Sequence, residues 1–199
     1  AYFVFVVALA AMAFLWNPFS LKSSRKHLRF TLFVPSVTVV FLACIITFHP
    51  FSEPRPDGRL RVEFLDVGQG DSIFITFPNG ETMLIDGGGR PSYRDKDDEP
   101  FEPDVPSIGE TVVSEFLWEK GYSQIDHIVA THADADHIQG LSDVARNFTI
   151  GRAGFGIPRP DDEDYVRLTG TLDRNRVPKR NLFRGDMIEI AGVKIEVLH

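Results

Sequence analysis

The sequence predicts an α/β domain preceded by transmembrane helices. Apolar and charged residues alternate over 60–64, which is the period of a β-strand with one buried face. An apolar run at 126–130 precedes residues 138–148, where apolar residues recur at helical spacing. Two uncharged apolar runs, 1–16 and 30–48, come before both patterns. Membrane and α/β parts are therefore expected in that order.

The charge of the chain is divided in the same way. Residues 50–199 contain 17 basic and 28 acidic residues, a formal charge of −11. Residues 1–49 contain no acidic residue, and their only Lys and Arg residues are Lys22, Arg25, Lys26 and Arg29.

The run 30–48 predicts a transmembrane helix, since about 20 residues of helix cross a bilayer. Pro35 would kink this helix without excluding it from the membrane. A buried helix of a soluble domain is the alternative, but such a helix normally has a polar face. The run 1–16 predicts the end of an earlier helix. A signal peptide is less consistent with that run, because no basic region precedes it and residues 17–19 (NPF) are not a small-residue cleavage site.

The basic loop 17–29 predicts the orientation. Loops rich in Lys and Arg face the cytoplasm, so residues after 49 are expected outside it. The protein would then be a multi-pass protein of the cytoplasmic membrane, in contact with lipid. Residues 50–58 are rich in Pro, Gly and charge and predict a linker to a domain at 59–199.

The domain is expected to begin with three strands. Leu60, Val62 and Phe64 would form the buried face of the first strand. The second and third, 73–77 and 82–85, are separated by a hairpin signal at 78–80 (PNG).

Helices and further strands follow. Residues 90–106 are acidic and proline-rich and predict a surface insertion; as a calcium loop they lack EF-hand spacing. The remaining expected elements are a helix that begins with a capping box at 107–110 and stops at Gly121, a strand at 126–130, a helix at 138–148, a strand at 150–157, a helix at 161–172 and a hairpin at 187–197.

The motif at 132–137 (HADADH) indicates a metal site. Four of its six side chains are metal-ligand types, and it directly follows a predicted strand. His132 and Asp134 lie two residues apart and would point the same way. Asp136 and His137 would open the next helix, whose amino terminus favours the anions that a metal site gathers. We expect two adjacent divalent ions; a solvated acidic loop is the alternative.

This motif resembles the HxHxDH signature of the metallo-β-lactamase fold, with Asp134 in place of the second histidine. Residues 64–71 (FLDVGQGD) and 84–88 (LIDGG) are similar to the two preceding motifs of ComEC-type DNA-internalisation (competence) proteins, in which aspartate is usual at that second position. The resemblance implies the first half of a metallo-β-lactamase αβ/βα sandwich. It also implies that further ligands would follow residue 199, so that this chain would be a catalytically incomplete fragment.

The resemblance implies a role for each site residue. His132 and Asp134 would hold the first metal, Asp136 and His137 the second, and Asp86 would orient or approach the pair. Asp66, Gln69 and Asp71 of the motif at 64–71 would line the opening of the same metal site. Turn chemistry is an equally good reason for the presence of Asp66 and Gln69. The catalytic candidates are Asp136, Asp86 and Asp71.

Two metals would suit hydrolysis of a phosphodiester. Asp134 makes the ligand set richer in oxygen, which shifts the preference from zinc towards manganese or magnesium, with zinc also accommodated. The family implies a membrane-tethered nuclease in DNA uptake for natural transformation, with DNA and other uptake components as partners. An exported hydrolase of another ester and a non-catalytic channel-associated domain are the alternatives.

The acidic charge opposes the DNA hypothesis, because nucleic-acid affinity comes mostly from Lys and Arg. A basic strip could supply the attraction, or it could be an ordinary solvated face: Arg174, Arg176, Lys179, Arg180 and Arg184.

Overall fold

The computed structural model describes residues 7, 37–45, 47, 54–90 and 106–198. The chain divides into two compact units, Ala1–Ser52 and Glu53–His199. Residues 37–45 of the first unit are helical. Among the helices that are described, none has both the length and the apolar character needed to cross a bilayer. Outside the described residues lie the predicted segments 1–16 (apart from residue 7) and 17–29, residues 30–36, 46 and 48 of the predicted helix 30–48, and residues 91–105 of the predicted insertion.

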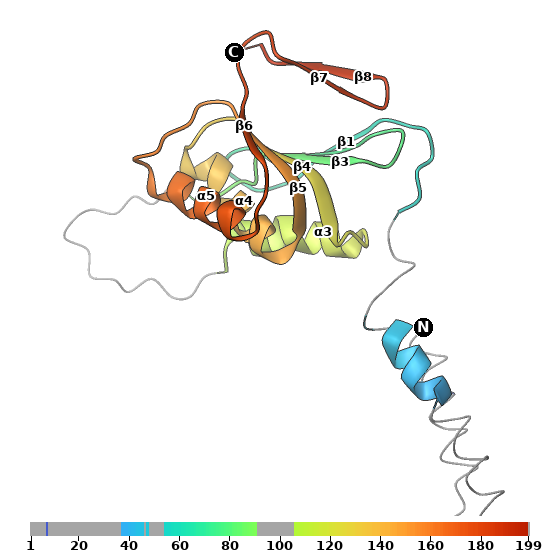
Figure 1. Cartoon of the computed structure of the whole chain (residues 1–199). Coiled ribbons are helices and arrows are strands. Elements are labelled where there is room, and N and C mark those ends of the chain that lie inside the picture. Colours follow the sequence, from blue (N-terminus) through green and yellow to red (C-terminus); the bar gives the residue numbers. More distant parts are fainter. Residues whose placement is uncertain (1–6, 8–36, 46, 48–53, 91–105, 199) are drawn as a thin grey trace, which may run out of the picture. The chain divides into compact units, whose positions relative to one another are not determined.

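The second unit is built on a six-stranded mixed sheet with the order β1-β2-β3-β4-β5-β6 (Figure 1). The first three strands are antiparallel neighbours, and β3 to β6 run parallel. This arrangement confirms the predicted α/β class. The strands are β1 (Arg61–Phe64), β2 (Ile73–Thr76), β3 (Thr82–Ile85), β4 (Gln124–Ala130), β5 (Thr149–Phe155) and β6 (Lys179–Asn181).

Helices cover one face of this sheet (Figure 1). Phe74, Leu84 and Ile128 point from the strands into the main core, where they pack with Val113 and Leu141 from the helical layer; all five are almost completely buried. Burying a side chain of this size contributes about 1.5–3 kcal/mol. The helical segments are the π-helical turn η1 (Gly109–Ser114), α3 (Glu115–Glu119), α4 (Ala135–Asn147) and α5 (Glu163–Arg174).

A hairpin lies on the other face. Its strands β7 (Met187–Ile190) and β8 (Val193–Glu196) form a separate two-stranded sheet. Ile190 packs with Phe77 and Met83 in a second, smaller cluster of buried residues.

The predicted buried face of the first strand was wrong. Leu60, Val62 and Phe64 are 47%, 46% and 77% exposed. β1 is an edge strand that pairs only with β2. The alternation correctly indicated that one side is apolar, but burial of that side requires an element to cover it, and none does so in the described part of the chain.

Three further details differ from the sequence predictions. The helix at 107–120 begins with the π-helical turn η1 and not with a regular α-helical turn, although the hydrogen bond expected of the capping box is present: Ser107 Oγ accepts from the Glu110 N–H (3.2 Å). The helix expected from Ile138 begins at Ala135, so part of the metal-ligand motif lies within its first turn. Strand β6 was not predicted, because three exposed polar residues carry no hydrophobic period.

Candidate metal centre

The candidate site lies where two neighbouring parallel strands end. Leu84 of β3 pairs with Ile128 of β4, so the chain leaves both strands at the same edge of the sheet. Asp86 directly follows β3, and Thr131 directly follows β4. The parallel pairing of β3 and β4 therefore brings together the motif at 84–88 and the motif at 132–137.

The glycine segment after Asp86 allows this approach. The Gly87 N–H donates to the carbonyl of His137 (2.8 Å), and the Gly140 N–H donates to the carbonyl of Gly88 (2.9 Å). A Cβ atom on Gly87 would lie 2.5 Å from the backbone nitrogen of Leu141. Only glycine lets the loop contact the first turns of α4 in this way.

Asp86 is the buried centre of the site. It is 2% exposed and has a left-handed backbone (φ 56°), a conformation that aspartate tolerates better than most residues. Its Oδ1 accepts from the Thr131 N–H (2.8 Å), and its Oδ2 accepts from the Thr131 hydroxyl (2.6 Å) and lies 3.0 Å from His137 Nδ1. Both oxygens are therefore engaged within the protein.

These contacts assign the tautomers of both histidines. A carboxylate only accepts, so His137 Nδ1 carries the proton that it donates to Asp86. Thr131 has one hydroxyl proton and donates it to Asp86, so its Oγ1 accepts from His132 Nδ1 at 2.9 Å. When the ring is neutral, this places the lone pair on Nε2 of each imidazole, which is the form that binds a metal. Thr131 was not predicted from the sequence; its place between a strand and the first histidine was the available signal.

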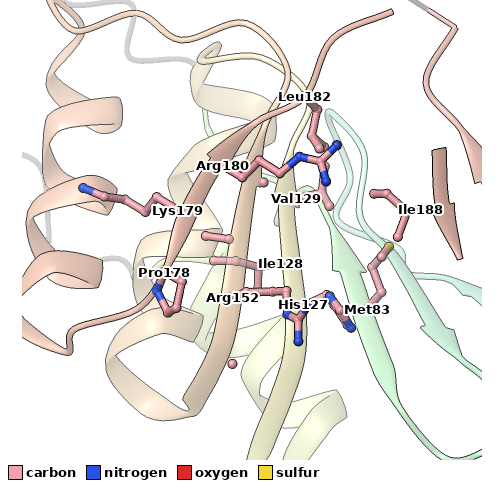
Figure 2. Close-up of a pocket in the computed structure, with 13 residues that line it drawn as sticks. Met83, His127, Ile128, Val129, Arg152, Pro178, Lys179, Arg180, Leu182 and Ile188 are labelled. Atoms are coloured by element: carbon pink, nitrogen blue, oxygen red, sulfur yellow. The ribbon is translucent and has the colours of Figure 1, made fainter. Parts of the chain in front are cut away.

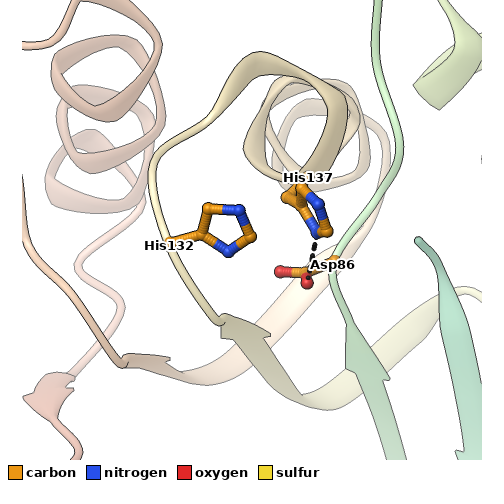
Figure 3. A group of neighbouring side chains, drawn as sticks. All are labelled: Asp86, His132 and His137. Atoms are coloured by element: carbon orange, nitrogen blue, oxygen red, sulfur yellow. Dashed lines mark hydrogen bonds and ion pairs between the residues drawn. The ribbon is translucent and has the colours of Figure 1, made fainter. Parts of the chain in front are cut away.

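The side chains present fit a divalent ion. Asp86, His132 and His137 each place a potential ligand atom within 4.8 Å of the others, and the two imidazole centroids are 4.0 Å apart (Figure 3). His132 Nε2 lies 3.6 Å from Asp134 Oδ2. Two donors that are each about 2.1 Å from a tetrahedral ion lie about 3.4 Å apart, so this spacing suits shared ligation.

The other two residues of the motif differ in their surroundings. Asp134 is exposed, and its Oδ1 lies 3.1 Å from a guanidinium nitrogen of Arg159. Asp136 is half-buried in the first turn of α4, and its carboxylate has no hydrogen-bond or ion-pair partner among the described residues. A Cβ atom on Gly70 would lie 1.7 Å from the carbonyl oxygen of Asp136, so the glycine brings the turn at 66–71 against the motif.

The side chains of that turn are less closely tied to the site. Asp66, Gln69 and Asp71 are exposed. Asp66 Oδ1 accepts from the Gly68 N–H (3.3 Å), which is turn chemistry, and the carbonyl of Asp71 accepts from the Gly88 N–H (2.9 Å). Within the described ranges, none of the three side chains forms a hydrogen bond or ion pair with the cluster. The turn reaches the site through its backbone.

A separate cavity of about 290 Å³ lies on strands β4 to β6 (Figure 2). Apolar side chains line it together with Arg152, Lys179 and Arg180, and the Asp86–His132–His137 cluster is not part of it. Lys179 and Arg180, two members of the basic strip, form ion pairs with Asp173 and Asp186.

The mixed sheet, its helical layer and the paired histidines at the strand ends are in accord with one family. The sequence pattern of the metallo-beta-lactamase superfamily matches residues 65–170, and the chain belongs to that superfamily. Its members typically bind divalent metal ions, and the Asp86–His132–His137 cluster offers an Asp/His site for one.

One curated relative is ComE operon protein 3 of Bacillus subtilis (strain 168). The two proteins are 33% identical over 164 residues, which cover 79% of this chain and 20% of the relative. The chain therefore spans about a fifth of the length of that protein.

Proposed function

We propose that this chain belongs to a membrane-tethered, metal-dependent hydrolase that cleaves DNA during uptake for natural transformation. One observation carries the hydrolase assignment: the Nδ1 atoms of His132 and His137 are held by Thr131 and Asp86, so both rings can offer Nε2 to a metal ion. Similarity to a protein of the ComE operon, together with the competence-type motifs, supports DNA uptake.

The proposed ligands come from one motif. His132 and Asp134 would hold one ion, and Asp136 and His137 a second. Bound divalent ions would lower the pKa of water and neutralise the charge that develops on a phosphodiester. Because two of the four ligands are carboxylates, manganese suits the set best, and zinc or magnesium could also be held.

The acidic residues divide into two roles. Asp86 is a positioning residue, because both of its oxygens are bonded to Thr131 and His137. Asp136 and Asp71 are the candidates for proton transfer, since neither carboxylate has a partner in the described part of the chain. Asp66 and Gln69 are the candidates for lining the mouth.

The tether is proposed from the sequence. Residues 1–49 would form the membrane region, residues 50–58 the linker and residues 59–199 the metallo-β-lactamase-like domain. The basic loop 17–29 supports a cytoplasmic location for that loop, which would place the domain outside the cytoplasm. Fusing a reporter active only outside the cytoplasm after residue 58 would test this orientation; an inactive reporter there would contradict it.

A transformation assay tests the function. The double variant Asp136→Ala, His137→Ala in the intact protein is expected to lose bound metal and transformation together. Asp57→Ala is the matched control, because Asp57 is an exposed carboxylate that pairs with Arg61 and belongs neither to the motif at 132–137 nor to the basic strip. Normal transformation by the double variant would remove catalysis from the proposal.

The acidic charge of the domain supports a second candidate, hydrolysis of an ester other than DNA. Residues 50–199 carry a formal charge of −11, and two cations of the basic strip are neutralised by Asp173 and Asp186. Turnover of small phosphoesters or lactones without strand degradation would favour this alternative.

A further inference from the structure

A cation from outside the motif at 132–137 lies at the proposed metal centre. Arg159 Nη1 is 3.1 Å from Oδ1 of Asp134, whereas Oδ2 of the same carboxylate is 3.6 Å from His132 Nε2. The arginine thus binds one oxygen of Asp134 and leaves the other beside the histidine.

The chain that carries Arg159 is fixed to the end of β4. The Gly156 N–H donates to the carbonyl of Ala130 (2.9 Å), and the Ile157 N–H donates to the carbonyl of Thr131 (3.1 Å). A Cβ atom on Gly156 would lie 2.4 Å from that Thr131 oxygen, so the close approach depends on glycine. The segment after β5 therefore runs directly beside the start of the metal motif.

The segment is also fixed on its other side. Pro158 and Pro160 flank Arg159 and restrict the backbone, and the Asp162 N–H donates to the Arg159 carbonyl (3.0 Å). Asp162 is the N-cap of α5 and accepts from the Tyr165 N–H (3.0 Å). The backbone at Arg159 is thus held by a strand end and by a capped helix, so ordering the arginine at Asp134 costs only the rotamer entropy of its side chain.

We propose that Arg159 is a positioning residue of the metal centre: it holds Oδ1 of Asp134 so that Oδ2 acts as a single ligand beside His132. The guanidinium is always charged and offers several N–H donors in a fixed plane, which suits this task. Without it, the exposed Asp134 carboxylate could turn into solvent or bind an ion through both oxygens. The inference rests on the proposed function to the extent that Asp134 must be a ligand.

The pair is suited to a clean test because both side chains are exposed, at 55% and 57%. Exposed ion pairs contribute little to folding stability, so an effect on metal affinity can be separated from an effect on folding. Arg167 is the matched control: it is an arginine with a 50% exposed side chain, paired with Asp164 at 2.8 Å in α5.

The experiment measures binding of Mn²⁺ alone to the intact protein by titration calorimetry, with the electron paramagnetic resonance spectrum of the bound ion as a second readout. Arg159→Ala is expected to weaken Mn²⁺ binding about 10- to 100-fold, which is typical when a residue that orients a metal ligand is lost. The resonance spectrum of the bound Mn²⁺ should also change, because the position of the Asp134 carboxylate changes. Arg159→Lys should restore part of the affinity, because an ammonium supplies the charge without the planar fork. Arg167→Ala should bind as the parent does.

Each other result overturns the inference. Unchanged Mn²⁺ affinity and spectrum in Arg159→Ala would show that Asp134 needs no support, and tighter binding would show that Arg159 competes with the metal. DNA hydrolysis is measured separately: a parent protein that binds Mn²⁺ with the expected Arg159 dependence but cleaves no DNA would overturn the proposed function alone. A parent that binds none of Mn²⁺, Zn²⁺ and Mg²⁺ would overturn both.

Discussion

Oδ2 of Asp86 lies 3.0 Å from Nδ1 of His137, although the two residues are 51 positions apart in the chain. The same oxygen accepts the Thr131 hydroxyl, which in turn lies 2.9 Å from Nδ1 of His132. One buried carboxylate therefore orients both imidazoles of the candidate site. Such outer contacts set the tautomer and ring orientation of metal ligands.

Replacing Asp86 should weaken metal binding although none of the four proposed metal ligands is removed. Asp86→Ala leaves the Thr131 N–H and the His137 Nδ1–H without their acceptor. Because Thr131 is exposed and His137 is only partly buried, the cost should be about 1 kcal/mol of unfolding free energy for each group. Mn²⁺ affinity should fall about 10- to 100-fold, measured by calorimetry.

Asp86→Asn is the conservative companion, because it keeps the volume and one acceptor oxygen. It should retain more stability than Asp86→Ala but still bind metal less tightly than the parent. Parental affinity in both variants would show that the histidines need no carboxylate to hold them.

Gly70→Ala should disrupt the junction between the turn at 66–71 and α4. The new Cβ would lie 1.7 Å from the Asp136 carbonyl oxygen, and φ at Gly70 is 85°. Gly68 is a close control, since its φ is 75° but a Cβ there would meet nothing within 4 Å. Gly68→Ala should cost only the left-handed backbone, about 1–2 kcal/mol. Gly70→Ala should cost about 1–3 kcal/mol more in urea unfolding, and equal losses would contradict the close contact.

Two leucines test the burial of the sheet. Leu141 is 0% exposed in the core, whereas Leu60 is 47% exposed beside β1. Leu141→Ala should lower the unfolding free energy by about 2–5 kcal/mol. Leu60→Ala should change it by no more than about 0.5 kcal/mol. A large loss on truncating Leu60 in thermal unfolding would indicate that another element covers this side of the sheet.

The carboxyl of Asp186 should titrate below its ordinary value. A hydrogen bond from the Arg180 guanidinium, followed by one from the Phe183 N–H, holds the pKa of Asp186 below 3.8. A lowered folded-state pKa means that the contribution of Asp186 to stability is present above pH 3.8 and is lost as pH falls through the lowered pKa. Carboxyl NMR titration should show this shift, and Arg180→Gln should move the pKa back towards 3.8. An unshifted value in the parent would contradict the Arg180 contact.

Much of the fold could be predicted because the local signals were strong. Alternating apolar residues predicted the first two strands, and the hairpin signal at 78–80 predicted the third. The repeat from Ile138 to Phe148 predicted most of α4. The motif at 132–137 also directed attention to the end of β4, since four of its six side chains are metal-ligand types. The ligand assignments within that motif, and the roles of Asp66, Gln69 and Asp71, stay predictions.

Other features depend on contacts between distant segments and had no local signal. The apolar side of β1 is exposed because burial depends on a covering element and not on the alternation itself. Strand β6 exists because β5 supplies its hydrogen-bond partner. Thr131 and Arg159 join the site only because parallel pairing brings the ends of β3, β4 and β5 to one edge of the sheet.

The amino-acid sequence by itself determined the α/β class, the order of the main elements and the segment that carries the ligand-type side chains, because each of these depends on residues close together in the chain. Tertiary structure alone decided that Asp86 orients His137, that Thr131 links it to His132, and that Arg159 holds Asp134. These are contacts between residues on separate strands and loops, and their geometry is set by how the sheet pairs and how closely its glycines let the loops approach.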